Sequence, residues 1–193
     1  MDFTFVFASL VFAMTPGLAT MYILNNSTMY GRKEGIISAF GILSGGMIYN
    51  IVAAAGLGVL ITKFPFVFHG IKVVGAIYLI YVGIKSIMDK GGNTSGEKSK
   101  NCFRDGVITN LANPKVLIFF ATFIPQFVSG AGKSVGGELF VLGVTYLFVE
   151  LIWFMCLAIF TAMFTERFQE FFQTKMKYIS GVVFILMGGM LFL

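Results

Sequence analysis

Charged residues are scarce in this chain. They make up 12% of its 193 residues, whereas hydrophobic residues make up 57%, and the mean hydropathy is +0.87. A soluble domain has about 25% charged and about 45–50% apolar residues. The composition therefore excludes a soluble domain and predicts an integral membrane protein. Six apolar stretches are long enough to cross a bilayer as helices, near residues 3–25, 36–61, 65–87, 106–128, 137–163 and 177–193.

Cysteine is also rare, and a basic leader is missing. Cys102 and Cys156 lie far apart without CxxC spacing, so we expect neither a disulfide nor a metal site. No Lys or Arg precedes the first apolar stretch, which argues against a cleaved signal peptide. The spans show no clustered nucleophile and base, so we expect no enzyme activity and no cofactor. The net charge of +5 flanks membrane spans, and it therefore predicts no nucleic-acid partner.

Lys and Arg are concentrated in alternate connections between the predicted spans. Basic residues are enriched in the cytoplasmic loops of membrane proteins. The connections after spans one, three and five are therefore predicted to be cytoplasmic, with both termini outside. These connections hold Arg32, Lys33, Lys85, Lys90, Lys98, Lys100, Arg104, Arg167, Lys175 and Lys177, whereas the other side holds Lys63 and Lys133, with Lys72 assignable to either.

Two of the few prolines interrupt the first and fourth apolar stretches at matching places. They lie in Thr15-Pro16-Gly17 and Asn113-Pro114-Lys115. With three spans in each half, the second half enters the membrane upside down relative to the first. We therefore predict an all-α membrane protein of six transmembrane helices, arranged as a 3+3 inverted repeat with helices 1 and 4 broken at proline. A single transport domain covers 1–193, with repeat 1 at about 1–88, a cytoplasmic loop at about 89–105 and repeat 2 at about 106–193.

The breaks carry candidate binding groups, because irregular backbone in a bilayer must be buried in protein or line water. At Pro16 and Gly17, freed amides at a helix N-terminus can bind a carboxylate; the alternative is a kink for packing. At the second break, Asn113 adds an amide and Lys115 a cation. Lys115 either lies beside the broken helix in water or reaches toward the cytoplasmic headgroups. Pro125-Gln126 predicts the end of this helix.

Glu150 is the single most informative polar residue, since it lies near the middle of the fifth span between apolar neighbours. A charge there costs about 2.5–3.5 kcal/mol on insertion scales, so Glu150 must face protein or water. Burial favours the protonated carboxyl, which suits proton binding and release or recognition of an amino group. The alternative is a structural pair with Lys115 or with a hydroxyl such as that of Tyr49. Asn50 either contacts substrate or joins two helices.

The chain resembles the LysE/RhtB family of bacterial amino-acid exporters over nearly its whole length. The resemblance rests on an ordered set of short motifs, and Leu18 departs from the proline or small residue common in the family. The matching segments are Thr15-Pro16-Gly17, Gly56-Leu57-Gly58, the run from Lys72 to Gly83, Asn110 to Lys115, Pro125-Gln126-Phe127, and Leu142 to Thr145 leading to Glu150.

This resemblance implies a secondary transporter in the bacterial cytoplasmic membrane that exports amino acids and is driven by protons. We expect alternating access around a site formed by Thr15, Pro16, Gly17, Asn50, Asn113, Pro114, Lys115 and Glu150, with Glu150 exchanging the proton. An exporter of another small solute or of a heavy-metal cation on the same fold is the alternative. A metal exporter calls for several Asp, Glu, His or Cys residues in its spans. A homo-oligomer is compatible with the sequence.

Overall fold

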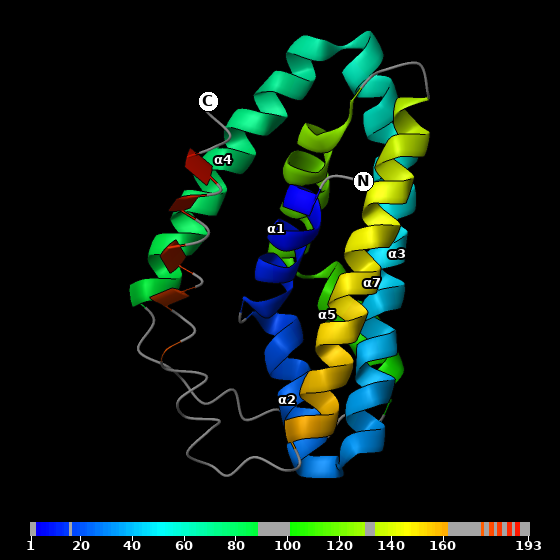
Figure 1. The fold of residues 1–193 in the computed structure, drawn as a ribbon, viewed down its shortest axis with the longest axis vertical. Coiled ribbons are helices and arrows are strands. Elements are labelled where there is room, and N and C mark those ends of the chain that lie inside the picture. The colour runs from blue at the N-terminus through cyan, green and yellow to red at the C-terminus, as the bar shows by residue number, and fades with distance from the viewer. Residues whose placement is uncertain are drawn as a thin grey trace.

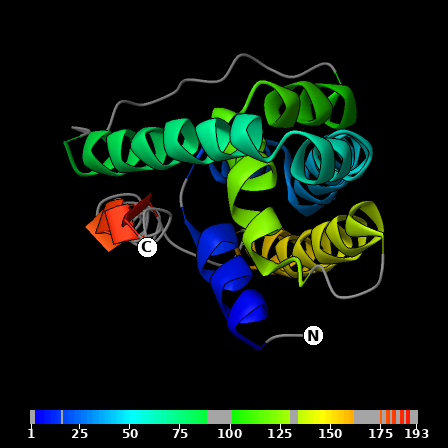
Figure 2. The ribbon, with the colours of Figure 1, turned by 90° about the horizontal axis from the view of Figure 1, so that it is seen from above.

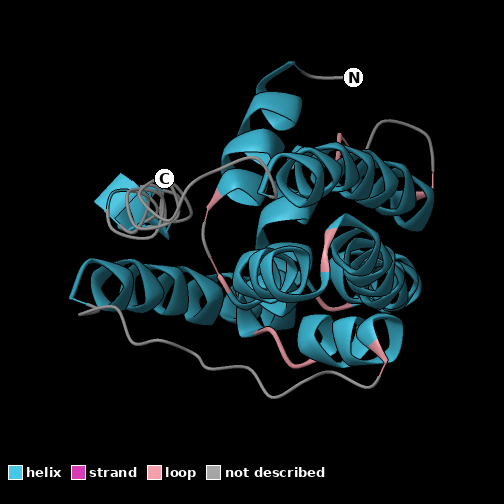
Figure 3. Cartoon of the chain, turned by 90° about the horizontal axis from the view of Figure 1, so that it is seen from below, coloured by secondary structure: helices cyan, strands magenta, loops and turns pink. Residues whose placement is uncertain are grey.

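The computed structural model describes residues 3–15, 17–88, 101–129, 134–161 and scattered helical positions between 175 and 189. Every regular element in these residues is a helix, which confirms the all-α prediction (Figure 3). The elements are α1 (Phe3–Met14), α2 (Leu18–Tyr30), α3 (Arg32–Lys63), α4 (Pro65–Met88), α5 (Cys102–Leu111), α6 (Pro114–Ile118), the π-helical turn η1 (Phe119–Phe123), the 3-10 turn η2 (Ile124–Phe127) and α7 (Val135–Thr161).

Two described helices, α3 and α7, are long and apolar enough to cross a membrane unaided, and they contain most of the predicted spans 36–61 and 137–163. Each of the predicted spans 3–25 and 106–128 is a pair of helices that meet at a bend. The axes of α1 and α2 differ by 56°, and those of α5 and the Pro114–Phe127 segment differ by 53°. If each bent pair counts as one span, the described residues hold up to four.

The described residues cover the other predicted spans and the polar loop only in part. The span predicted at 65–87 forms α4, a helix of 24 residues. The span predicted at 177–193 lies largely outside the described residues, so the count of six stays a prediction. Most of the polar loop predicted at 89–105 is also outside them, although α5 begins at Cys102, earlier than expected. The helix end predicted at Pro125-Gln126 is confirmed, because η2 ends at Phe127 and Val128 is extended.

The helix α3 is the centre of the bundle, and it packs against α7, α5 and α2. Glycines allow the close approach of α3 to α5. A side chain at Gly41 would collide with the Phe103 carbonyl, and one at Gly106 would lie 2.8 Å from the Ser38 carbonyl oxygen. The bundle is therefore joined there by backbone-to-backbone contact, as small residues permit between membrane helices.

The helix α4 runs along one flank of the bundle, where the described helical positions between 175 and 189 lie beside it (Figures 1 and 2). Gly83 packs against the carbonyl of Gly181, and Gly188 packs against the carbonyl of Ala76. From Ala76 to Gly83 on α4, the contact residue on the other segment goes back from Gly188 to Gly181. The two segments therefore run antiparallel.

Two apolar clusters fill the bundle, one above and one below the level of the helix breaks. The first contains Phe5 and Phe12 of α1, most of η1, and Leu139, Tyr146 and Leu147 of α7. The second contains Ala19, Ile23 and Leu24 of α2, with Ala39, Ile42, Phe154, Leu157 and Ala158. On the first bent pair, the boundary between the clusters is the break. On α7, it falls between Leu147 and Phe154, where Glu150 lies.

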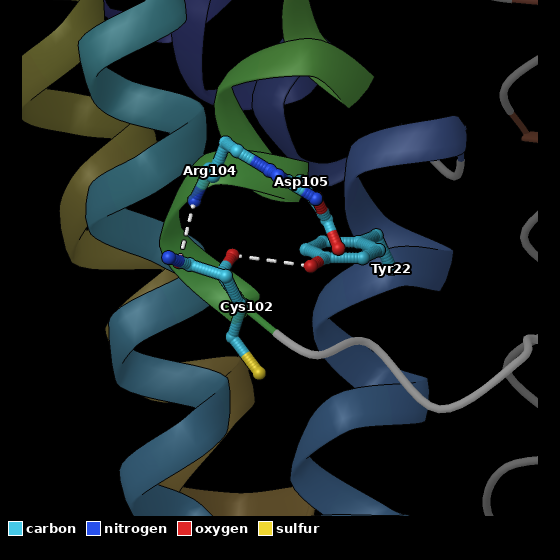
Figure 4. Close-up of polar contacts among 5 residues, drawn as sticks. Tyr22, Cys102, Arg104 and Asp105 are labelled. Carbon is cyan, nitrogen blue, oxygen red and sulfur yellow. Dashed lines mark hydrogen bonds and ion pairs between the residues drawn. The ribbon is translucent and has the colours of Figure 1, made fainter.

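A further contact holds the first turn of α5 against α2. The Tyr22 hydroxyl donates a hydrogen bond of 3.1 Å to the carbonyl of Cys102 (Figure 4). Asn101 caps the same turn, because its side chain accepts the Arg104 N–H at 3.0 Å. The start of α5 is thereby fixed, and its far end leads into the second break.

Candidate functional site

The first break separates α1, which ends at Met14, from α2, which begins at Leu18. Thr15 is 2% exposed, and its hydroxyl donates to the Val11 carbonyl at 2.8 Å. Gly17 is the N-cap of α2 in an extended conformation, and no side chain caps the helix there. Pro16 lies outside the described residues. The first-turn amides of α2 therefore lack a side-chain cap, as expected of a break that leaves backbone groups available.

The second break separates α5, which ends at Leu111, from α6, which begins at Pro114. Pro114 occupies the first turn of α6, where its missing N–H costs nothing. Asn113 is 3% exposed, and its side chain accepts the Lys115 N–H at 3.1 Å, which caps α6. The Tyr49 hydroxyl donates to the Leu111 carbonyl at 2.5 Å. Both ends of this break thus have side-chain partners.

Lys115 connects the two breaks. Its ammonium Nζ donates to the carbonyls of Phe12 at 2.9 Å and Thr15 at 2.8 Å, and it lies 4.5 Å from the centroid of the Phe12 ring. An added Cβ at Gly17 would lie 3.5 Å from Lys115 Cδ. The side chain therefore points to the end of α1 within the protein, and the headgroup alternative is not what the structure shows.

Glu150 is 3% exposed, so its predicted burial is confirmed. Its Oε1 accepts the Tyr146 hydroxyl at 2.6 Å. Its Oε2 has no hydrogen-bond partner among the described residues. Glu150 is thus paired with a hydroxyl, as the structural alternative expected, but with that of Tyr146 in place of Tyr49, and Lys115 binds the Phe12 and Thr15 carbonyls.

An aromatic layer lies between the two charged side chains. The ring of Phe12 lies beneath the Lys115 ammonium and packs edge-on against Tyr146, with centroids 5.9 Å apart. Phe119 contacts both rings, with centroids 4.0 Å from Phe12 and 4.4 Å from Tyr146. A path from the lysine to the carboxyl therefore crosses tilted and edge-on ring contacts and ends at the Tyr146 hydroxyl.

Asn50 makes its contacts about two helical turns before Glu150 along α7. Its Nδ2 donates to the Phe140 carbonyl at 3.1 Å, and its side chain fills the space beside Gly143. It joins α3 to α7, which was the alternative to a substrate contact, and its Oδ1 has no partner among the described residues. The structure therefore gathers Thr15, Gly17, Asn113, Pro114 and Lys115 at the breaks, with Glu150 beyond the rings and Asn50 apart.

Three residues of this region were missed by the sequence reasoning. Tyr146 is one helical turn before Glu150, and that i, i+4 spacing is a signal that was available. Phe12 has no distinguishing signal among the 23 phenylalanines. Asn110 is fully buried and donates to the Ile42 carbonyl at 2.6 Å; its position three residues before Asn113 was a weak pointer.

The described part of the chain has no group of three or more His, Cys, Asp and Glu residues able to hold a metal ion. A shallow apolar hollow lies on α4, lined by Phe66, His69, Gly70, Val73 and Val74. It contains none of the residues at the breaks.

A protein family and several known proteins resemble this chain over most of its length. The family described as LysE type translocator matches residues 10–193. A protein of Enterobacter sp. strain 638 named leucine efflux protein is 28% identical over 194 residues, covering 96% of this chain and 90% of its own. A leucine efflux protein of Klebsiella pneumoniae is 27% identical over 193 residues, covering 94% and 90%. The uncharacterized membrane protein YrhP of Bacillus subtilis strain 168 is 29% identical, covering 90% and 89%. No solved structure matches the chain.

Proposed function

Because the chain belongs to the family of LysE type translocators, we propose that it exports amino acids from the bacterial cytoplasm by alternating access coupled to protons. The observation that carries this proposal is that the two helix breaks meet at Lys115, at the same level of the bundle as the buried Glu150. Leucine is the first substrate to test, since two extensively aligned relatives are named leucine efflux proteins.

The substrate site is assigned to the first break. A zwitterionic amino acid needs donors for its carboxylate and acceptors for its ammonium. The first turn of α2 offers backbone N–H groups and the positive end of a helix dipole. The end of α1 offers the Phe12 and Thr15 carbonyls. Broken membrane helices in transporters present the same two kinds of group to their substrates.

Alternating access follows from the proposed 3+3 inverted repeat. The bent pair α1–α2 runs from the α3–α4 end of the bundle to the opposite end, and the α5–α6 pair runs the other way (Figure 1). Two antiparallel broken helices that touch at their breaks are suited to rocking of one repeat against the other. Motion about the breaks exposes the site first to one side of the membrane and then to the other.

Proton coupling is assigned to Glu150. Its Oε2 has no partner among the described residues, and a buried carboxylate oxygen left in that state favours protonation. Its position on α7, between the two apolar clusters, supports a proton step at the level of the breaks. Proton uptake from outside and release to the cytoplasm then accompany each cycle of export.

The end of the bundle where α2 meets α3 is proposed to face the cytoplasm. Arg32 and Lys33 begin α3, and Arg104 is in the first turn of α5, at the same end (Figure 1). Lys63 ends α3 at the opposite end. The excess of basic residues at one end supports a cytoplasmic assignment there, which leaves the start of α1 outside.

The test is export from vesicles. Purified protein is reconstituted into liposomes loaded with a panel of radiolabelled amino acids, and efflux is followed with and without an inward proton gradient. We expect gradient-stimulated efflux of leucine, and Glu150→Gln should lower that stimulated rate by about tenfold or more, a loss of about 1.4 kcal/mol, while leucine exchange at equal pH persists. Glu138→Gln is the matched control, since Glu138 is also on α7 but binds Ser129 at 2.8 Å.

Each part of the proposal has its own contrary result. Efflux of no amino acid in the panel would reject amino-acid export. Gradient-driven efflux that is unchanged in Glu150→Gln would reject the proton role of Glu150 and leave the export itself standing.

A further inference from the structure

The Lys115 ammonium lies in a site that has the properties of an ammonium-binding site. Two backbone carbonyls accept its N–H groups at 2.8 and 2.9 Å, and the Phe12 ring lies 4.5 Å away by its centroid. Carbonyls at the end of a helix carry the negative end of its dipole, and an aromatic face attracts a cation. These groups recognise an alkylammonium as such, with no feature specific to lysine.

An α-amino acid carries the same alkylammonium group. Its carboxylate is attached one carbon away, and the same break offers the first-turn amides of α2 next to Gly17, where no side chain caps the helix. A substrate ammonium at the Phe12 and Thr15 carbonyls therefore has a carboxylate site within the same break. The Lys115 ammonium and the substrate ammonium require the same acceptors.

The lysine is able to leave this place by side-chain rotation alone. Its backbone N–H is fixed by the Asn113 side chain, so its Cα stays with α6. Its stem passes the backbone of Gly17, where an added Cβ would lie 3.5 Å from Cδ and 3.9 Å from Nζ. These are ordinary van der Waals distances, so the stem is in contact with the backbone there without being wedged, and its four rotatable bonds give the ammonium other positions.

We propose that Lys115 is a tethered competitor of the substrate, whose ammonium fills the amino-group subsite at the Phe12 and Thr15 carbonyls until a transported amino acid displaces it. This inference rests on the proposed function. It gives the empty transporter satisfied carbonyls at the break, where unpaired groups are costly in a membrane. It also restricts the substrate class to compounds with a free ammonium group.

The first experiment measures leucine binding to the purified protein in detergent by calorimetry. Lys115→Met removes the competing charge and keeps a side chain of similar length. If lysine fills the subsite about 90% of the time, its removal tightens leucine binding about tenfold. Binding of 4-methylpentanoate, which is leucine without its amino group, should not tighten. Lys63→Met, at the exposed end of α3, is the control and should bind leucine as the wild type does.

Weaker or unchanged leucine binding in Lys115→Met would overturn the inference, as would equal tightening for 4-methylpentanoate. A second measurement uses the wild type, in case the variant does not fold. Amine-reactive labelling of Lys115, read by mass spectrometry, should be faster with leucine present, whereas labelling of Lys63 should not change. Slower or unchanged labelling of Lys115 would overturn the inference. Leucine efflux by the same preparation shows whether the proposed function holds independently.

Discussion

The two helix breaks satisfy their backbone groups in different ways. At the second break, the side chains of Asn113 and Tyr49 bind the start of α6 and the end of α5. At the first break, α2 has no side-chain cap, the Thr15 hydroxyl binds the Val11 carbonyl, and the Phe12 and Thr15 carbonyls are bound by Lys115, 100 to 103 residues along the chain. The capped second break therefore fits a role in shape. The first break, whose main partner is the Lys115 ammonium, is the one proposed to exchange partners.

The largest effect on transport is expected from filling the first break with a side chain. Gly17 has a φ of −167°, which any residue adopts, so a side chain there introduces no backbone strain. In Gly17→Leu, the added atoms occupy the space beside Lys115 and the α2 amides. We expect leucine efflux to fall by about tenfold or more, equivalent to about 1.4 kcal/mol, with normal amounts of folded protein. Leucine efflux from reconstituted vesicles measures this fall.

The matched control for this prediction is Gly56→Leu. An added Cβ at Gly56 meets nothing within 4 Å among the described atoms, and the residue is exposed on α3. Its efflux should equal that of the wild type. Wild-type efflux in Gly17→Leu would show that the first break is a packing kink and not the binding site.

The positions of both breaks were predictable because their cause is local. Proline lacks an N–H and clashes with the preceding turn, so the chain cannot continue a helix through it. The structure confirms this at Pro114, and α1 and α2 end and begin on either side of residue 16. The burial of Glu150 was predictable for a similar reason, since a charge within an apolar helix must avoid lipid.

The contacts across the breaks were not predictable, because they depend on tertiary packing. Spacing along the chain does not say that Lys115 reaches Phe12, or that Asn50 binds Phe140. The partner of Glu150 was within reach of sequence reasoning, because Tyr146 is four residues earlier on the same helix. The sequence interpretation offered a hydroxyl such as that of Tyr49 as a structural partner, and the helical period points to the nearer Tyr146.

The second break is tested by removing its cap. Asn113→Ala deletes the acceptor of the Lys115 N–H, and losing an N-cap costs about 0.5–2 kcal/mol. Because Asn113 is 3% exposed, water cannot easily replace it, so we expect the upper half of that range. The free energy of unfolding in detergent measures the loss, whereas leucine efflux per folded molecule should be nearly unchanged.

Asn101→Ala is the control for the cap, because Asn101 caps α5 by accepting the Arg104 N–H at 3.0 Å but is exposed. Its cost should be at the lower end of the same range. If Asn113→Ala lowers efflux per folded molecule as strongly as Gly17→Leu does, the distinction between a structural break and a binding break is wrong.

The smallest effect is expected from Tyr49→Phe. This change removes the hydroxyl that donates to the Leu111 carbonyl. It keeps the ring stacked near that of Phe120, with centroids 6.2 Å apart. A net hydrogen bond contributes about 0.5–1.5 kcal/mol. Tyr22→Phe removes the comparable bond at the other end of α5, away from either break. If the second break only gives shape, both variants lose similar stability in detergent and export leucine at an unchanged KM. A raised KM in Tyr49→Phe alone would mean that substrate also contacts the second break, because Tyr22→Phe weakens the same helix without touching that region.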